Sequence, residues 1–293
     1  MDQTGVEACV VFTDAIGADF DRQEELFRPH GERFLLFCSL DTSEPGSRDY
    51  SRRAVRELER CHRHCARGLG EISDKGWGLE SGLAAMRSGA PEAALPRSQR
   101  LHPDDPRLDA VWEKCAGLGM PVNIHVADHP SCWYPPGPNQ ERMPVFDFFN
   151  MSGLDVPPYT KLLGMRDRAV AKHPRTVFIA AHLGNQGNDL NSLGQSLDRY
   201  PNLYIDVSAR DYELGRQPRF AREFLTKYRD RVLFGSDMPC SEAMYRDWWR
   251  LLETADEFLS GRAGWPHYGL ELPDAVLKSL YRENAKRLLR IGR

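Results

Sequence analysis

The stretch PVNIHVAD, residues 121–128, decides the fold prediction. Its branched residues alternate with other types and lie on one face of a strand, because side chains in a strand point to opposite faces in turn. Asn123 and His125 lie on the other face. The stretch is too short for a core helix and is rich in β-branched residues, so it predicts a buried strand with polar residues at its end.

Similar runs occur on both sides of this stretch. They are ACVVF from Ala8, FLLFCSL from Phe34, ARGLGEIS from Ala66, TVFIAAHLG from Thr176, NLYIDVSA from Asn202 and RVLFGSDMP from Arg231. Helix-period segments separate them, such as DAVWEKCAGLG, in which Gly117 and Gly119 are candidate helix-stopping residues. Strands that alternate with helices predict βαβ units and a parallel sheet, so we expect one α/β domain over residues 1–293.

Length and composition agree with this class and exclude others. The 293 residues are enough for an α/β barrel, which takes about 250 residues. The net charge of −3 gives no attraction for nucleic acid or anionic membranes, and no apolar run is long enough to span a bilayer. The odd count of seven cysteines indicates reduced thiols, and the start lacks the layout of a signal peptide, so we expect a cytoplasmic protein.

Two connections between the expected strands are long, at about residues 76–107 and 129–160. Insertions after the strands of a parallel sheet lie at its carboxyl edge, where α/β active sites are found. The second connection is dense in proline and aromatic residues, including Trp133, Tyr134, Phe146, Phe148 and Phe149. We expect it to cover a substrate; the alternative is a surface excursion.

Three strand ends carry the residues with the most informative chemistry: His125, His182 and Asp237. A single histidine in a strand is commonly a hydrogen-bonded core residue, but three such residues at equivalent ends favour a site. Two imidazoles and a carboxylate are the ligand set of catalytic zinc sites. A metal held there would lower the pKa of a bound water to about 7, and Asp237 would ligate the metal, accept the water's proton, or do both.

Other polar residues lie near these strand ends. Arg210 is a candidate contact for a substrate carboxylate, and the alternative is an ordinary ion pair. Glu71 is a candidate partner of a metal ligand or a substrate contact, and Asp128 and His129 are candidates to orient His125 or to contact substrate. Lys75, which follows the run GLGEIS, is interpreted as a loop residue.

The segments PVNIHVAD, FIAAHLGN, LYIDVSAR, LFGSDMP and ENAKRLL, in this order, resemble the amidohydrolase-related family of the amidohydrolase superfamily, which includes aminocarboxymuconate-semialdehyde decarboxylase. The resemblance implies a TIM-type (β/α)₈ barrel that holds a divalent metal, zinc first and manganese as the alternative. By this resemblance His125 is a metal ligand, and Asp237 binds metal and handles the proton. His182 either polarises the substrate or binds a second metal.

One family feature has no counterpart in the sequence. The family's first strand carries an H-x-H or E-x-H pair that completes the metal site, whereas MDQTGVEACVVF resembles the end of the first helix leading into the second strand. We therefore expect a barrel without its first strand in this chain. A shortened version of a longer protein is favoured over a lineage that lost part of the site.

The function predicted from these features is metal-dependent hydrolysis of a small substrate with a carbonyl or carboxylate group. Asp237 supplies the proton relay that hydrolysis needs. The first alternative is a non-oxidative decarboxylase of the same family, and the second is a metal-free pseudoenzyme or binding protein. The expected partner is a small-molecule substrate, with neither nucleic acid nor membrane, and a homodimer is an open possibility.

Overall fold

The computed structural model describes residues 1–79, 96–135, 150–260 and 263–291. Its internal contacts divide the chain into two compact units. The first contains Met1–Ala127 and Val156–Ile179, and the second contains Asp128–Asp155 and Ala180–Arg293. Each unit is described by itself below.

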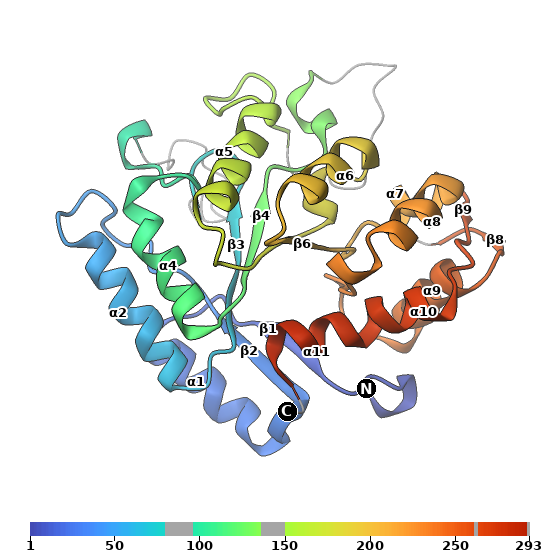
Figure 1. Ribbon diagram of the computed structural model, residues 1–293, viewed down its shortest axis with the longest axis horizontal. Helices are drawn as coiled ribbons and strands as arrows, with labels where there is room; N and C mark the ends of the chain where they lie inside the picture. Colours follow the sequence, from blue (N-terminus) through green and yellow to red (C-terminus); the bar gives the residue numbers. More distant parts are fainter. Residues whose placement is uncertain (80–95, 136–149, 261–262, 292–293) are drawn as a thin grey trace. The chain divides into compact units, whose positions relative to one another are not determined.

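The first unit is built on four parallel strands paired in chain order (Figure 1). They are β1 (Cys9–Phe12), β2 (Phe34–Cys38), β3 (Gly68–Asp74) and β4 (Val122–Val126). The register places Cys9 opposite Phe34 and Ser73 opposite His125. All five residues of β4 are buried, which is typical of a parallel strand covered on both faces.

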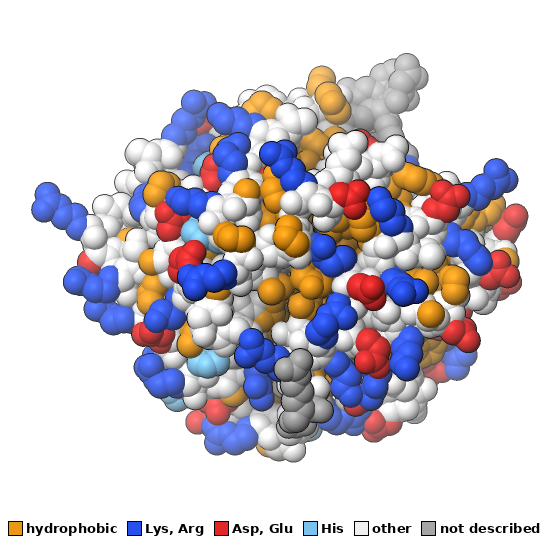
Figure 2. All heavy atoms as spheres, in the orientation of Figure 1, with side chains coloured by type: hydrophobic (Ala, Val, Ile, Leu, Met, Phe, Trp, Pro, Cys, Tyr) orange, Lys and Arg blue, Asp and Glu red, His pale blue; other side chains and the backbone are white. Residues whose placement is uncertain are grey.

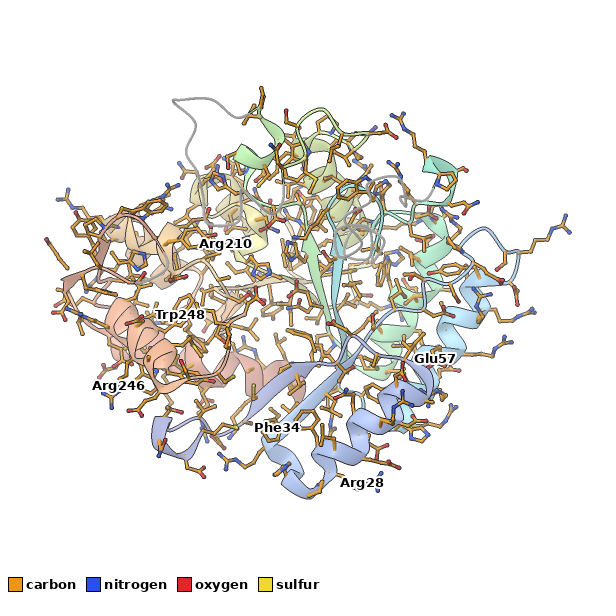
Figure 3. All side chains as sticks on the ribbon, turned by 180° about the vertical axis from the view of Figure 1, so that it is seen from behind. Arg28, Phe34, Glu57, Arg210, Arg246 and Trp248 are labelled. Carbon is orange, nitrogen blue, oxygen red and sulfur yellow. The ribbon has the colours of Figure 1, made fainter. Side chains whose placement is uncertain are left out.

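Helices follow the strands of this unit along the chain. The α-helices are α1 (Gly17–Phe27), α2 (Tyr50–Arg63), α4 (Asp109–Leu118) and α5 (Tyr159–Lys172), and the 3₁₀ turns are η1 (Asp2–Thr4), η2 (Arg28–Arg33), η4 (Arg97–Gln99) and η5 (Pro106–Leu108). Helix α4 ends where the sequence predicts, because Gly119 adopts a left-handed φ of 67° and its N–H bonds back to Ala116. Glu57 of α2, labelled in Figure 3, accepts the N–H of Gly17 at 2.7 Å and so joins α2 to the first turn of α1.

The second unit contains a parallel pair, β6 (Leu203–Asp206) and β7 (Val232–Leu233), and an antiparallel pair, β8 (Glu257–Phe258) and β9 (His267–Tyr268). Strand β5 (Phe178–Ala180) runs across the boundary of the two units.

The helices of the second unit follow its strands (Figure 1). They are α6 (Leu190–Arg199), α7 (Asp211–Gly215), α8 (Pro218–Lys227), α9 (Glu242–Glu253), α10 (Asp274–Lys278), α11 (Asn284–Leu289), the 3₁₀ turns η6 (Pro130–Trp133), η7 (Leu183–Asn185) and η8 (Arg229–Arg231), and the π-helical turn η9 (Ser279–Glu283).

Buried aromatic and amide groups hold this unit together. Trp248 of α9 is 1% exposed and packs edge-on against Phe234, with ring centroids 5.6 Å apart. Figure 3 shows Trp248 on α9 together with Arg246. The side chain of Asn284 is also buried, and it donates to the carbonyl oxygens of Arg229 and Val232 at 2.6 and 2.7 Å. Asn284 therefore secures the C-terminal helix to the start of β7.

All seven strands expected from the sequence are present, each shorter than its apolar run. Of the two long connections, residues 80–95 and 136–149 lie outside the described residues, and with them Phe146, Phe148 and Phe149. Among the described residues, no helix has the length and apolar character needed to cross a membrane. Basic and acidic side chains are interspersed on the face shown in Figure 2, in keeping with a net charge of −3.

Candidate functional site

In the first unit, His125 is fixed by a carboxylate of the neighbouring strand. His125 lies on β4 and is 7% exposed. Its Nδ1 lies 2.7 Å from Oε1 of Glu71 on β3. An ionised carboxylate only accepts hydrogen bonds, so Nδ1 carries the proton and the lone pair is on Nε2. Glu71, which the sequence offered as a partner of a metal ligand or as a substrate contact, thus orients His125 within this unit.

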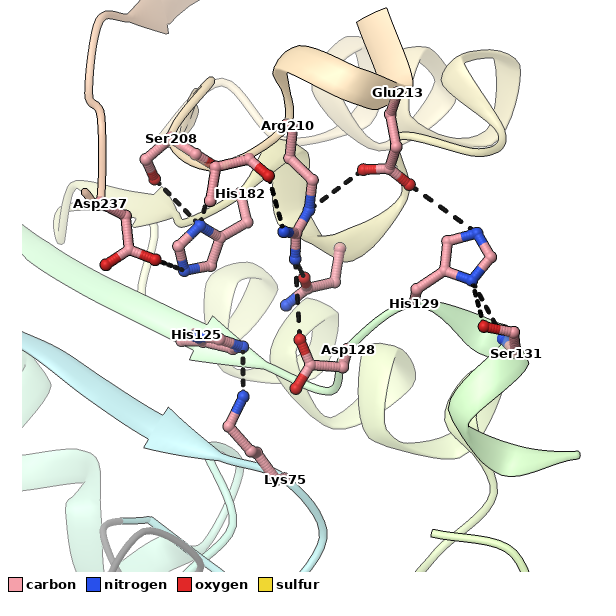
Figure 4. Close-up of polar contacts among 12 residues, drawn as sticks. Lys75, His125, Asp128, His129, Ser131, His182, Ser208, Arg210, Glu213 and Asp237 are labelled. Atoms are coloured by element: carbon pink, nitrogen blue, oxygen red, sulfur yellow. Dashed lines mark hydrogen bonds and ion pairs between the residues drawn. The ribbon is translucent and has the colours of Figure 1, made fainter. Parts of the chain in front are cut away.

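Lys75 contacts the other nitrogen of the same imidazole. It directly follows β3 and is 3% exposed, and its Nζ lies 3.0 Å from Nε2 of His125 (Figure 4). An ammonium group is a donor only, which agrees with a lone pair on Nε2. The interpretation of Lys75 as a loop residue missed this contact. Glu71, Ser73 and Lys75 alternate along one face of the strand, and this spacing is the signal that could have indicated it.

The turn after β3 is held by Asp74, which is fully buried. Its carboxylate accepts the N–H groups of Gly76 and Gly78 at 2.8 and 3.1 Å and the Nδ1–H of His102 at 2.7 Å. Burial disfavours a charged His102, but the hydrogen bond to Asp74 and the charge of Asp74 outweigh burial and raise the pKa of His102. This network fixes the backbone from which Lys75 projects.

In the second unit, His182 is oriented by the end of β6. His182 has a left-handed φ of 60° and is 2% exposed, and its backbone N–H donates to Oδ1 of Asp206 at 2.9 Å. Its Nδ1 lies 2.9 Å from the carbonyl oxygen of Ser208. A carbonyl oxygen only accepts, so Nδ1 is protonated and Nε2 presents a lone pair.

Asp237 lies opposite that lone pair. Its Oδ2 is 4.0 Å from Nε2 of His182, and its side chain is 59% exposed whereas that of His182 is buried (Figure 4). Asp237 follows β7 by four residues and adopts a left-handed φ of 49°. An accessible carboxylate beside a buried, oriented imidazole can exchange a proton with a small molecule that reaches both.

A buried ion-pair network involves Arg210, which is 3% exposed (Figure 4). Its Nε lies 3.1 Å from Glu213, and its terminal nitrogens lie 3.7 Å from Asp128 and within hydrogen-bond distance of Asn185. Burial acts to lower the pKa of Arg210, but Tyr212, Glu213 and Asp128 together raise it. The guanidinium is therefore a fixed positive charge inside the second unit.

Glu213 and His129 form the other end of this network. Burial raises the pKa of Glu213 to about 7, although the charge of Arg210 opposes the rise. Burial and the charges of Arg216 and Arg210 lower the pKa of His129 to about 4. Nδ1 of His129 accepts the N–H of Ser131 at 3.2 Å, so its proton is on Nε2, which lies 3.8 Å from Oε1 of Glu213. No spacing in the sequence connects these two residues, and Glu213 was not predicted as a site residue.

The donor atoms suit a divalent transition metal. In both His125 and His182 the proton is on Nδ1, bonded to an oxygen, and the lone pair is on Nε2. This is the arrangement of metal-ligating histidines, whose second nitrogen donates to a carboxylate or a carbonyl group. Asp237 adds a carboxylate oxygen, so the residues present fit zinc or manganese chemically.

The structure thus places each sequence-predicted residue with a partner in its own unit. Glu71 contacts His125, Asp237 lies opposite His182, and Arg210 pairs with Asp128.

Solved structures of similar fold come from several bacteria. An uncharacterised TIM-barrel protein of Bordetella bronchiseptica is 17% identical, with a TM-score of 0.58 over 99% of this chain and 80% of that chain. A 2,6-dihydroxybenzoate decarboxylase from Rhizobium is 19% identical, with a TM-score of 0.59 over 100% and 87%. A probable 2-pyrone-4,6-dicarboxylic acid hydrolase of Acinetobacter baumannii is 11% identical, with a TM-score of 0.55 over 99% and 86%.

At these identities the similarity establishes the fold, and the predicted TIM-type barrel is confirmed. None of the curated proteins matches the sequence significantly. The sequence model of one family, described as amidohydrolase, matches residues 1–291. Because this match spans nearly the whole sequence and agrees with the resemblance of the strand-end segments, the chain belongs to the amidohydrolase family, a family of enzymes.

Proposed function

We propose that the protein is a metal-dependent hydrolase of a small substrate that bears a carbonyl or carboxylate group. The observation that carries the proposal is the pair His182 and Asp237: a buried imidazole with a fixed tautomer, 4.0 Å from an accessible carboxylate. Hydrolysis needs a group that takes a proton from water and returns it to the leaving group. Asp237 has the exposure and the neighbour for that task.

The proposed metal ligands are His125, His182 and Asp237, and the proposed metal is zinc, with manganese as the alternative. Their support is the donor chemistry described above, with an Nε2 lone pair on each histidine. When bound, such a metal polarises a carbonyl oxygen and lowers the pKa of water. Glu71 then serves His125, and the carbonyl group of Ser208 serves His182, by holding each ring in the required tautomer.

The chain's own residues supply the proton transfers. Asp237 accepts the proton of the attacking water and passes it to the leaving group. Where His182 does not ligate the metal, its Nε2 takes a proton from solvent, and the resulting imidazolium donates a hydrogen bond to the substrate's carbonyl oxygen while Nδ1 stays bonded to Ser208. This refines the role predicted for His182, because the neutral ring in this tautomer cannot donate from Nε2.

Arg210, Asp128 and Glu71 are the proposed substrate-binding residues. The contact of Arg210 with Asp128, at 3.7 Å, is longer than its 3.1 Å contact with Glu213. A substrate carboxylate that binds Arg210 in place of Asp128 would therefore break only the longer of these two ion pairs. Glu71 keeps 22% of its side-chain surface exposed and so remains accessible while it orients His125.

Decarboxylation is the second candidate, favoured by the similarity of fold to the Rhizobium 2,6-dihydroxybenzoate decarboxylase. The same residues would serve it, because the carbon that loses CO₂ must be protonated, and Asp237 beside His182 can hold that proton.

A substrate screen tests both candidates. Purified protein supplied with zinc or manganese is assayed against lactones, amides and aromatic carboxylates, for acid release and for CO₂ release. Asp237→Asn is expected to abolish the activity found, and Asp247→Asn, an exposed residue of α9, to leave it unchanged. Acid release without CO₂ supports the hydrolase and CO₂ release supports the decarboxylase. Retention of full activity in Asp237→Asn contradicts both and favours a different catalytic group.

A further inference from the structure

The strongest unexplained feature of the first unit is the ammonium group of Lys75 at Nε2 of His125. The distance is 3.0 Å, and both side chains are buried, with 3% and 7% of their surfaces exposed. Burial of a lysine is costly, and lysines are seldom buried without a partner. The metal-ligand role proposed for His125 does not account for this contact.

The hydrogen-bond roles at His125 leave no ambiguity about which atom Lys75 engages. Glu71 accepts the proton of Nδ1 at 2.7 Å, so the ring has a single lone pair, on Nε2. Lys75 donates to that lone pair. It is the same lone pair that a metal would need, and one nitrogen lone pair cannot serve a hydrogen bond and a coordinate bond at once.

The charge of Lys75 adds to this conflict. A metal bound at Nε2 would lie within a few ångströms of the present position of Nζ, and like charges at such a distance in a buried site repel strongly. The carboxylate of Glu71 stabilises either cation at His125, the metal or the ammonium group of Lys75, and so does not favour one over the other. Metal binding at His125 therefore requires Lys75 to leave Nε2.

We propose that Lys75 is a tethered cation that competes with the metal for Nε2 of His125 and thereby sets the metal affinity of the protein. The inference rests on the proposed function, in which His125 is a metal ligand. Glu71 keeps the ring of His125 in the tautomer that binds metal, and Lys75 holds its lone pair until a metal displaces it. The site then loads only when the free metal concentration is high enough to displace Lys75.

The test compares zinc affinities of the 293-residue chain and its variants by competition with a chromophoric chelator. Lys75→Met and Lys75→Gln both remove the positive charge. Thermal unfolding shows whether each variant folds, and with two variants the test remains valid if one of them does not fold. Each variant is expected to bind zinc about tenfold or more tightly than wild type. In wild type zinc must break the hydrogen bond between Lys75 and His125 before it binds, and the variants lack the charged donor of that bond. Lys161→Met, an exposed lysine of α5, is the matched control and is expected to match wild type.

His125→Ala separates the possible failures. If it weakens zinc binding while the Lys75 variants bind zinc no more tightly than wild type, Lys75 does not compete and this inference is wrong, but the metal role of His125 stands. Weaker binding in the Lys75 variants would make Lys75 a ligand or a support of the site, which also overturns the inference. If His125→Ala leaves zinc binding unchanged in the wild-type and Lys75→Met backgrounds, the proposed metal site itself is wrong.

Discussion

His182 donates its Nδ1–H to the carbonyl oxygen of Ser208 at 2.9 Å, and this one bond determines which nitrogen the ring presents. The acceptor is a backbone atom, so the tautomer is set by the chain path just after β6, and the hydroxyl oxygen of Ser208 lies 3.0 Å from the same Nδ1. Nε2 is left to face Asp237 at 4.0 Å.

Removing the His182 imidazole is expected to lower kcat by roughly 10²–10⁴, the usual contribution of a general acid–base group. The variant is His182→Asn, because asparagine tolerates the left-handed φ of 60° at this position. Steady-state kinetics on the substrate found by the screen gives the measurement. His30→Asn, an exposed residue, is the control. A kcat within a factor of two of wild type would mean that His182 takes no part in the chemistry.

Asp206 is expected to be the structural support of this arrangement. It is 7% exposed and accepts the backbone N–H groups of His182 and Ser208 at 2.9 and 3.1 Å. Asp206→Ala would leave both donors unpaired inside the protein and lower the free energy of unfolding by roughly 2–4 kcal/mol. Asp206→Asn keeps an accepting oxygen and is expected to lose less. Urea titration of both variants is the measurement, and equal losses would contradict the role of the accepting oxygen.

The pH dependence of stability tests the buried network around Glu213. Burial raises the pKa of Glu213 in the folded protein to about 7, from 4.5, so between these values the folded state binds more protons than the unfolded state. The contribution of Glu213 to stability is therefore fully present below pH 4.5 and is lost as the pH rises through about 7.

Glu213→Gln removes this titration. Relative to wild type, its free energy of unfolding is expected to rise by up to roughly 3 kcal/mol between pH 5 and pH 8. Denaturant unfolding across this range gives the measurement, and Glu223→Gln, an exposed residue of α8, controls for the loss of a surface charge. Parallel curves for wild type and Glu213→Gln would show that Glu213 titrates normally in the folded protein.

Glu71 is expected to influence metal binding through His125. Glu71→Gln replaces the carboxylate that accepts Nδ1–H with a neutral amide, which weakens the hold on the tautomer and the basicity of Nε2. Zinc affinity is expected to fall about 10–100-fold, as is usual when the hydrogen-bond partner of a ligating histidine is removed. Isothermal titration calorimetry measures this, with the exposed Glu25→Gln as control. An unchanged zinc affinity would show that Glu71 does not influence metal binding.

Much of the fold follows from local pattern. The runs around Phe34 and Val122 are apolar and short, and they form β2 and β4 within two residues of the predicted limits. Gly119 ends α4 because only a left-handed residue fits there, which composition alone can indicate. Strand alternation also placed His125 on the face opposite the branched residues of its strand, and Glu71 of the neighbouring strand contacts it.

The spacing of Glu71, Ser73 and Lys75 could have indicated the contact of Lys75 with His125, but no spacing indicates the partners of Glu213. Lys75 contacts a residue 50 positions away, and Glu213 is buried against Arg210 and His129 from separate segments. Such contacts depend on how loops return to strand ends, and charged residues beyond a strand look the same in sequence whether they are exposed or buried. Burial, which sets the pKa values of Glu213 and His129, is a property of the folded chain alone.

The most direct test of a metal-dependent enzyme is the metal content of the purified protein. Wild type and His125→Ala are equilibrated with zinc, freed of unbound metal and assayed by inductively coupled plasma mass spectrometry. The account predicts stoichiometric zinc in wild type and its loss in His125→Ala, because that variant lacks the ring whose Nδ1 lies 2.7 Å from Glu71 and whose Nε2 is the proposed metal ligand. Absence of stoichiometric metal from wild type, or equal amounts in both proteins, would contradict it.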